Sequence, residues 1–127
     1  MTPIQLFDPA SSTYTYLLFD PDTHEALIID PVHEQLQRDL DTLRQFGLRL
    51  VWSVETHAHA DHITSAGQLA ELVGARTAAP QGCGIGTAAV QLQDGEVLTF
   101  GRETLKALHT PGHTAGSMSF VWRDHVF

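Results

Sequence analysis

The segment Thr56–His62 reads T-H-A-H-A-D-H and places three histidines and an aspartate within six positions. In an extended chain alternate side chains lie on the same side, so His57 and His59 can point at one ion. Asp61 and His62 add a carboxylate and a third imidazole where the chain turns into a predicted helix. Imidazole with carboxylate, and without thiolate, suits zinc, iron or manganese. The segment therefore predicts a metal site, and the fold must bring its ligands to one point.

The predicted position of this segment supports a metal site. It directly follows a predicted buried strand, Leu48–Val54, and precedes a predicted helix, Ile63–Val73, which Gly74 closes. Ligands of α/β proteins collect beyond the carboxyl ends of strands, which is where this segment lies. A histidine-rich surface loop is the alternative, and it leaves the regular spacing unexplained.

The remaining periodicity predicts an α/β fold, or α+β in some schemes, with the order β-β-β-α-β-α-β followed by further strands. A helix after Pro31 is the clearest element, because its apolar residues recur every three or four positions until Gly47. These apolar positions are Val32, Leu36, Leu40 and Leu43. The other predicted strands are Ile4–Phe7, Thr13–Phe19, Ala26–Ile29, Ala75–Ala79, Gln91–Phe100 (with a turn at Asp94-Gly95), Thr104–Leu108 and Ser117–Arg123.

A second histidine-bearing segment, Leu108–Ser117, reads L-H-T-P-G-H-T-A-G-S. Pro111 and Gly112 predict a tight turn that presents His113 from a rigid loop. His113 is therefore the candidate for a distant ligand of the same metal. We expect His109 to be structural, and the remaining histidines to lie at the surface: His24, His33 and His125.

The composition argues against several classes of protein, among them nucleic-acid-binding and membrane-spanning proteins. Seven Lys and Arg against fifteen Asp and Glu give a net charge of −8 in 127 residues, which argues against a nucleic-acid partner. The apolar runs are far shorter than the ~20 residues of a membrane span, and the first residues lack the pattern of a signal peptide. The single cysteine, Cys83, cannot form an internal disulfide and fits a reducing cytoplasm; we expect a small residue in a flexible loop.

The last residues read as the beginning of a strand. Val126 and Phe127 are apolar and follow a turn-like segment, whereas domains usually end in polar, frayed residues. Asp124 is expected to form that turn and not to bind a metal. We treat residues 1–127 as one unit that is incomplete at its carboxyl end.

At these two histidine motifs the sequence resembles the metallo-β-lactamase-fold superfamily. Further strings are similar to its persulfide dioxygenase (sulfur dioxygenase) branch: S-T-Y-T-Y-L-L from Ser12, A-L-I-I-D-P-V from Ala26, and T-H-A-H-A-D-H-I-T from Thr56. The resemblance runs from Gln5 to the last residue. It departs from that branch at Ser65, where glycine is usual, and we expect little chemical effect.

The resemblance implies an αβ/βα sandwich of which residues 1–127 form the amino-terminal αβ half and the first strands of the second half. It implies one Fe(II) per chain that uses O2 to oxidise glutathione persulfide to sulfite, with His57 and His113 as ligands. The third ligand would be an aspartate in a T-G-D segment expected after Phe127. His59, Asp61 and His62 would orient the ligands, and Asp61 could supply the carboxylate in a rearranged site.

Two other functions stay open. In a zinc hydrolase of the hydroxyacylglutathione hydrolase type, His59, Asp61 and His62 would join in binding two Zn(II) ions, and a bridging water would attack a thioester. Alternatively, the chain is an inactive fragment or a metal-binding half-domain that lacks the third ligand. Such a half would expose a sheet face, so we expect a homo-oligomer or a complementary carboxyl-terminal half as partner.

Overall fold

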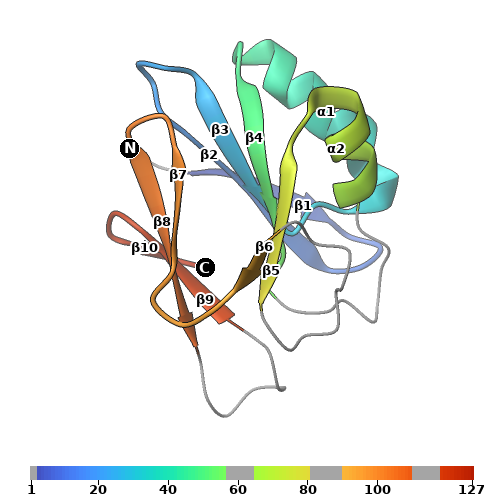
Figure 1. Ribbon diagram of the computed structural model, residues 1–127. Coiled ribbons are helices and arrows are strands. Elements are labelled where there is room, and N and C mark those ends of the chain that lie inside the picture. Colours follow the sequence, from blue (N-terminus) through green and yellow to red (C-terminus); the bar gives the residue numbers. More distant parts are fainter. Residues whose placement is uncertain (1–2, 57–64, 81–89, 110–117) are drawn as a thin grey trace.

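A computed structural model describes residues 3–56, 65–80, 90–109 and 118–127. Its elements form three layers (Figure 1): a four-stranded sheet, a six-stranded sheet, and two α-helices on the far face of the larger sheet. This arrangement confirms the predicted α/β class, with the helices and most strands in the predicted places. The described residues contain no helix that is both long and apolar enough to cross a bilayer.

The larger sheet is antiparallel at one side and parallel at the other, in the order β1-β2-β3-β4-β5-β6. Its strands are β1 (Ile4–Asp8), β2 (Thr13–Phe19), β3 (Glu25–Ile29), β4 (Arg49–Val54), β5 (Arg76–Pro80) and β6 (Val90–Leu92). Strands β3 to β6 run parallel to one another. Parallel neighbours need crossover connections, and those from β3 to β4 and from β4 to β5 carry the helices. β3 and β4 accordingly read as apolar runs, because both of their faces are covered.

The helical layer consists of η1 (His33–Gln35), α1 (Leu36–Gln45) and α2 (Ala66–Val73). α1 begins at Leu36, later than the predicted apolar face, because residues 33–35 form a 3-10 turn. Gly47 and Gly74 follow the helices with φ of 64° and 74°, as the predicted glycine stops require. A small core lies beneath the helices: Leu17, Ala26, Ile28, Leu43, Leu50, Leu69 and Ala75.

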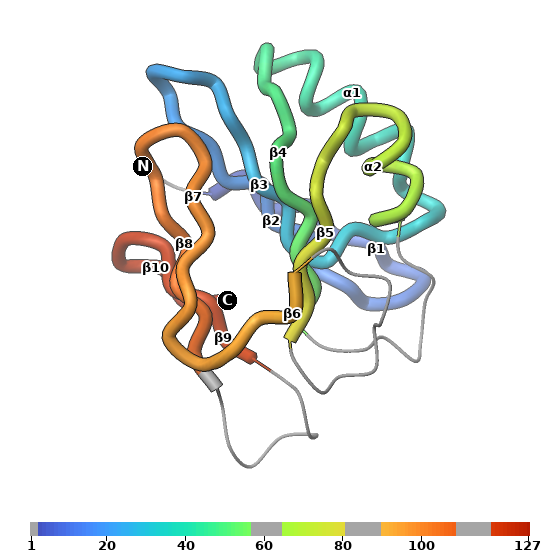
Figure 2. The backbone as a smooth tube through the Cα atoms, viewed as in Figure 1, coloured from blue at the N-terminus to red at the C-terminus, as the bar shows by residue number. Residues whose placement is uncertain are grey.

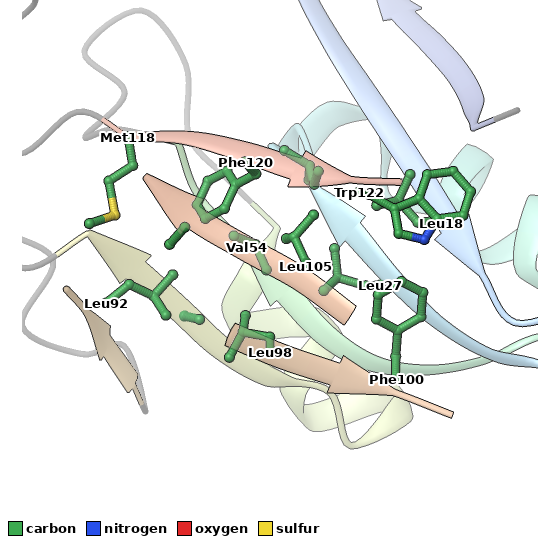
Figure 3. Close-up of a cluster of buried hydrophobic side chains, with 13 residues drawn as sticks. Leu18, Leu27, Val54, Leu92, Leu98, Phe100, Leu105, Met118, Phe120 and Trp122 are labelled. Atoms are coloured by element: carbon green, nitrogen blue, oxygen red, sulfur yellow. The ribbon is translucent and has the colours of Figure 1, made fainter. Parts of the chain in front are cut away.

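The smaller sheet is an antiparallel meander in the order β10-β9-β8-β7. Its strands are β7 (Val97–Phe100), β8 (Glu103–His109), β9 (Met118–Trp122) and β10 (His125–Val126). The main core lies between the two sheets (Figure 3), where Phe100, Phe120 and Trp122 are at most 1% exposed and face Leu18, Leu27 and Val54 of the larger sheet. These three aromatic residues are the largest fully buried side chains, and their burial stabilises the contact between the sheets.

The structure differs from two expectations. The turn at Asp94-Gly95 does not lie inside one strand but separates β6 of the larger sheet from β7 of the smaller one, so the chain crosses between layers there. His33 and His125 are half-buried, not surface residues. His125 stacks against Trp122 and Phe127 of its own hairpin at centroid distances of 5.7 and 6.4 Å.

The predicted strand at the end of the chain is present. His125 and Val126 pair with β9, and the Phe127 amide donates to the Phe120 carbonyl at 2.8 Å. Asp124 lies in the turn before this strand with 91% of its side chain exposed, as expected for a turn residue.

Polar contacts tie the β7–β8 turn to the β2–β3 turn, which lie side by side in the tube view (Figure 2). The Gly101 amide donates to Glu25 Oε1 at 2.9 Å, and the Arg102 amide donates to Asp20 Oδ2 at 2.7 Å. Asp20 is 1% exposed, and the hydrogen bond from the Arg102 amide is the main cause that lowers the pKa of its carboxyl. These contacts join the two sheets at the amino ends of the parallel strands.

Candidate functional site

The five residues predicted to bind or orient a metal lie outside the described residues: His57, His59, Asp61, His62 and His113. The same holds for Cys83 and for the side chain of His109. Among the residues that the structure does describe, no group of three His, Cys, Asp or Glu is placed to hold a metal. What the structure provides is the frame from which the segments 57–64 and 110–117 extend.

That frame is one edge of the larger sheet. Strands β3, β4 and β5 are parallel, so their carboxyl ends reach the same edge. The described residues at this edge are Asp30 after β3, Glu55 and Thr56 after β4, and Pro80 at the end of β5. The Glu55 amide donates to the Ala78 carbonyl at 3.0 Å, which holds the ends of β4 and β5 together. Thr56, the described residue next to the metal segment, therefore lies just beyond the end of β4. The sequence predicts the metal segment beyond the end of this same strand.

The two histidine-bearing segments are anchored at neighbouring residues. The Met118 amide donates to the Thr56 carbonyl at 3.0 Å. Thr56 is the residue before His57, and Met118 is the first described residue after the segment that contains His113. Met118 also pairs with His109 across β8 and β9, so both ends of segment 110–117 are held beside the end of β4. The tertiary fold thus connects two motifs that lie about fifty positions apart in the sequence.

Asp30 is the main anchor of this edge. Its carboxylate accepts hydrogen bonds from the Thr56 amide (2.8 Å, Oδ1) and the Thr56 hydroxyl (2.7 Å, Oδ2). The Asp30 amide donates to the Val54 carbonyl at 2.8 Å, and its own carbonyl accepts from the Thr15 hydroxyl at 2.8 Å. Asp30 is 8% exposed and adopts φ of 56°, a left-handed conformation that aspartate tolerates better than most residues. The residue before His57 is therefore fixed at both backbone and side chain.

Sequence reasoning did not find this role of Asp30. Its signal is a polar residue at the end of the apolar run Ala26–Ile29, one strand away from the metal segment. Charged residues are seldom buried without partners, so an aspartate at that position calls for a donor nearby. The sequence contains no indication that the donor is Thr56.

Two further polar residues at this edge are buried. Glu55 is 3% exposed and provides a second carboxylate beside the start of the metal segment. Ser65, at 0% exposure, precedes α2, and its carbonyl accepts the first helical hydrogen bond from the Leu69 amide at 2.9 Å. Ser65 does not cap the helix with its side chain. The start of α2 is thus packed against the sheet at the point where segment 57–64 ends.

His33 and Gln68 bridge η1 and α2 at the same side of the molecule. The His33 Nδ1 and Gln68 Nε2 atoms are 2.8 Å apart. The pair forms one hydrogen bond between the imidazole ring and the side-chain amide. This contact fixes the start of α2 relative to the turn after Asp30, so the segments that border the metal motif are held on both sides.

The donor types suit a transition metal. Segment 57–64 carries three imidazoles and one carboxylate, and segment 110–117 carries one imidazole. The described edge adds buried carboxylates that can accept from a ligand imidazole or from water. Buried carboxylates near a metal are stabilised by its positive charge. The residues present therefore fit a bound divalent cation at this edge.

Comparisons with known proteins agree with this fold. Residues 8–82 match the family model of the metallo-beta-lactamase superfamily. The persulfide dioxygenases ETHE1 of Bos taurus and Homo sapiens, named as mitochondrial, are 44% and 42% identical over 95% of this chain and 48% of their own length. The chain thus spans about half the length of the curated relatives it matches.

Solved structures give the same result. The crystal structure of ETHE1 from Myxococcus xanthus superposes with a TM-score of 0.95 at 43% identity, covering 100% of this chain and 56% of that chain. A metallo-beta-lactamase from Staphylococcus aureus superposes with a TM-score of 0.85 at 30% identity over 98% of this chain and 39% of that chain. The resemblance to the persulfide dioxygenase branch is confirmed, and the family match together with the fold shows that this chain belongs to the metallo-beta-lactamase superfamily.

Proposed function

We propose that the protein to which this chain belongs is a metal-dependent persulfide dioxygenase. Its substrate would be glutathione persulfide, oxidised with O2 and water to sulfite and glutathione. The observation that carries the proposal is the 41–44% identity to persulfide dioxygenases over 94–95% of the chain. The Asp30–Thr56–Met118 frame supports it, because it anchors both histidine motifs at one sheet edge.

His57 and His113 would hold one Fe(II), with a carboxylate as the third ligand. That carboxylate would come from a T-G-D segment beyond Phe127, or from Asp61 in a rearranged site. Bound there, Fe(II) would supply open positions for O2 and the persulfide sulfur. His59, Asp61 and His62 would orient the two histidine ligands and nearby water through hydrogen bonds.

Asp30 would act as a positioning residue for this site. It holds the backbone and hydroxyl of Thr56, so that His57 extends from a fixed point. Ligand geometry must be kept within a fraction of an ångström for a facial set of three ligands to bind tightly. The left-handed conformation of Asp30 is then part of how the chain presents its first ligand.

Oxygen uptake after anaerobic loading with Fe(II) tests the proposal. We expect about one iron per chain and O2 consumption that depends on glutathione persulfide, with sulfite as product. His57→Ala and His113→Ala should each remove most of the bound iron and the activity, whereas His24→Ala, at an exposed turn, should not. Fully iron-loaded protein that consumes no O2 with the persulfide would refute the proposal.

A zinc-dependent thioester hydrolase is the second candidate. A hydroxyacylglutathione hydrolase-like protein of Mus musculus is 32% identical over 95% of this chain and 42% of that protein. In this case His59, Asp61 and His62 would be direct ligands, and two Zn(II) ions would activate a bridging water. Metal analysis separates the two candidates, since about two zinc ions per chain would favour the hydrolase.

We also propose that residues 1–127 are an incomplete metallo-β-lactamase-like domain whose activity needs a further segment. If they are a metal-binding half, the chain alone should bind metal weakly and gain activity when a complementary half is supplied. A small thiol or persulfide is the expected substrate, and a reducing, cytoplasmic setting fits the single cysteine. Strong activity of the 127-residue chain by itself would contradict this part of the proposal.

A further inference from the structure

A cavity lies beneath the helices, away from the candidate metal edge. Its volume is about 360 Å³, within the usual range of small-molecule sites. It is bounded by the second half of α1, the start of β4 and the last residue of α2. Its apolar lining consists of five side chains: Leu40, Leu43, Leu48, Leu50 and Val73.

The cavity has a buried floor and an open mouth. Leu43 and Leu50 are 5% and 2% exposed and belong to the small core under the helices. Val73 is 38% exposed and stands at the rim. Such a cavity leaves apolar surface in contact with water, and an apolar ligand that displaced this water would gain the corresponding transfer free energy.

Two arginines complete the lining, in a chain that has only seven basic residues against fifteen acidic ones. Arg49 is exposed, and its guanidinium makes no hydrogen bond or ion pair with the described part of the chain. Arg44 is 77% exposed and contacts only the exposed carboxylate of Asp41, at 3.4 Å. Surface pairs of this kind are weak, so Arg44 can also turn to a ligand.

Among the described residues, Glu25 forms no ion pair with Arg49. Glu25 is the register partner of Arg49 across β3 and β4, but its Oε1 accepts from the Gly101 amide at 2.9 Å, in the contact between the two sheets. The cavity therefore combines a leucine-rich interior with one or two available guanidinium groups at its rim. Guanidinium groups recognise carboxylates through paired N–H donors.

We propose that this cavity binds a medium-chain carboxylate, with its hydrocarbon chain over Leu43 and Leu50 and its carboxylate at Arg49 and Arg44. The site lies at the amino end of β4, whereas the candidate metal edge lies at the carboxyl ends of the parallel strands. The carboxylate is thus a ligand separate from the persulfide substrate, and the inference does not depend on the proposed reaction.

Titration of the 127-residue chain with octanoate tests this site, by calorimetry and by the methyl NMR signals of leucine and valine. We expect saturable binding of one octanoate, with the largest shifts at Leu40, Leu43 and Val73. Octylammonium should bind at least tenfold more weakly, because the rim is positive, and acetate should not bind measurably, because it lacks the apolar chain.

Matched variants test which arginine binds the octanoate carboxylate. Arg49→Gln should weaken octanoate binding about tenfold, and Arg44→Gln should weaken it less. Lys106→Gln makes the same charge change on an exposed β8 position of the other sheet and should leave the affinity within twofold. Equal affinity for octylammonium, an unchanged affinity of Arg49→Gln, or shifts confined to other methyl groups would each overturn the inference.

Discussion

At the scale of single residues, Asp30 connects the fold to the candidate site. Both of its carboxylate oxygens are engaged by Thr56, at 2.8 and 2.7 Å, and the residue is 8% exposed. Asparagine has nearly the same shape but only one acceptor oxygen, so one of the two donors of Thr56 loses its partner. A buried donor without a hydrogen-bond partner lowers the free energy of unfolding by about 1–3 kcal/mol.

Asp30→Asn is therefore expected to lower metal affinity and persulfide-dependent O2 uptake by roughly 10–100-fold, the usual effect of losing a group that orients metal ligands. Bound metal per chain, measured beside the melting temperature, separates this effect from unfolding. Asp124→Asn is the matched control, since the Asp124 side chain is 91% exposed. If Asp30→Asn binds metal as tightly as the parent protein, the positioning role is wrong.

Asp39 in α1 is a second buried carboxyl group, and its ionisation makes the stability of the fold depend on pH. Burial raises its pKa from the ordinary value of 3.8 to about 6, against the opposing effect of Arg38, whose Nη2 lies 3.0 Å from Oδ1. As pH rises, the unfolded chain ionises this group first. The contribution of Asp39 to the free energy of unfolding is thus fully present below pH 3.8 and is lost as pH rises to about 6.

Asp39→Asn should flatten this pH dependence and should be more stable than the parent protein above pH 6, by about 1–3 kcal/mol. Because Arg38 loses its ion pair with Asp39 in this variant, the gain in stability is smaller than the pKa shift alone would give. Urea unfolding at pH 4, 5, 6 and 7.5 measures the effect. An identical slope between pH 4 and 6 in both proteins would show that Asp39 does not titrate in this range.

At the scale of elements, the contact between the β2–β3 and β7–β8 turns depends on Gly101. Gly101 has φ of 62°, and a Cβ built there collides with the Thr23 hydroxyl and approaches Asp20 Oδ2 to 2.6 Å. Asp20 is buried and holds the Arg102 amide, so it cannot move aside without losing that bond. A side chain at position 101 would separate the two turns.

Gly101→Ala should destabilise the protein by about 2–4 kcal/mol, from left-handed backbone strain together with steric overlap. Gly95→Ala is the matched control: its φ is 84°, but no atom lies within 4 Å of the added Cβ, so only about 1 kcal/mol is expected. Thermal unfolding of both variants measures the difference. Equal losses would mean that the two turns do not depend on this close approach.

Most helices and strands can be predicted from local sequence patterns. Apolar residues at every second position indicate a strand with one buried face, and apolar residues at every third or fourth position indicate a helix with one buried face. The spacing of Leu36, Leu40 and Leu43 predicts α1, and the alternation through Met118, Phe120 and Trp122 predicts β9. Sheet membership does not follow in the same way. β6 and β7 are separated by one turn yet belong to different sheets, because pairing depends on which partner each strand finds.

At the scale of the whole molecule, the smaller sheet has one face without helices in the described chain. Its inward residues are buried, but Val97 and Val126 on the outer side are 50% and 70% exposed. Exposed apolar groups on a sheet favour association. We expect the 127-residue chain to self-associate, with Val97→Asp and Val126→Asp together shifting it towards monomer.

Light scattering over a range of concentrations measures this association. Leu72→Asp is the control. Leu72 is 61% exposed on α2, so this substitution removes a comparable apolar group from the opposite layer. A monomer for the unchanged chain, or equal effects of the two kinds of change, would contradict the prediction.

The sequence by itself determined the chemistry of this protein: imidazole and carboxylate donors in two spaced motifs, a strand before the first, and the order of most helices and strands. These properties are local, since they depend on residue type and spacing along the chain. The tertiary structure alone decided that Asp30 holds Thr56, that Met118 joins the two motifs, and that a leucine-lined cavity carries two arginines. The first two contacts join residues that are far apart in the chain, and the cavity closes only where Val73 of α2 packs beside residues 40–50. Their proximity follows only from the parallel register and the packing of the layers.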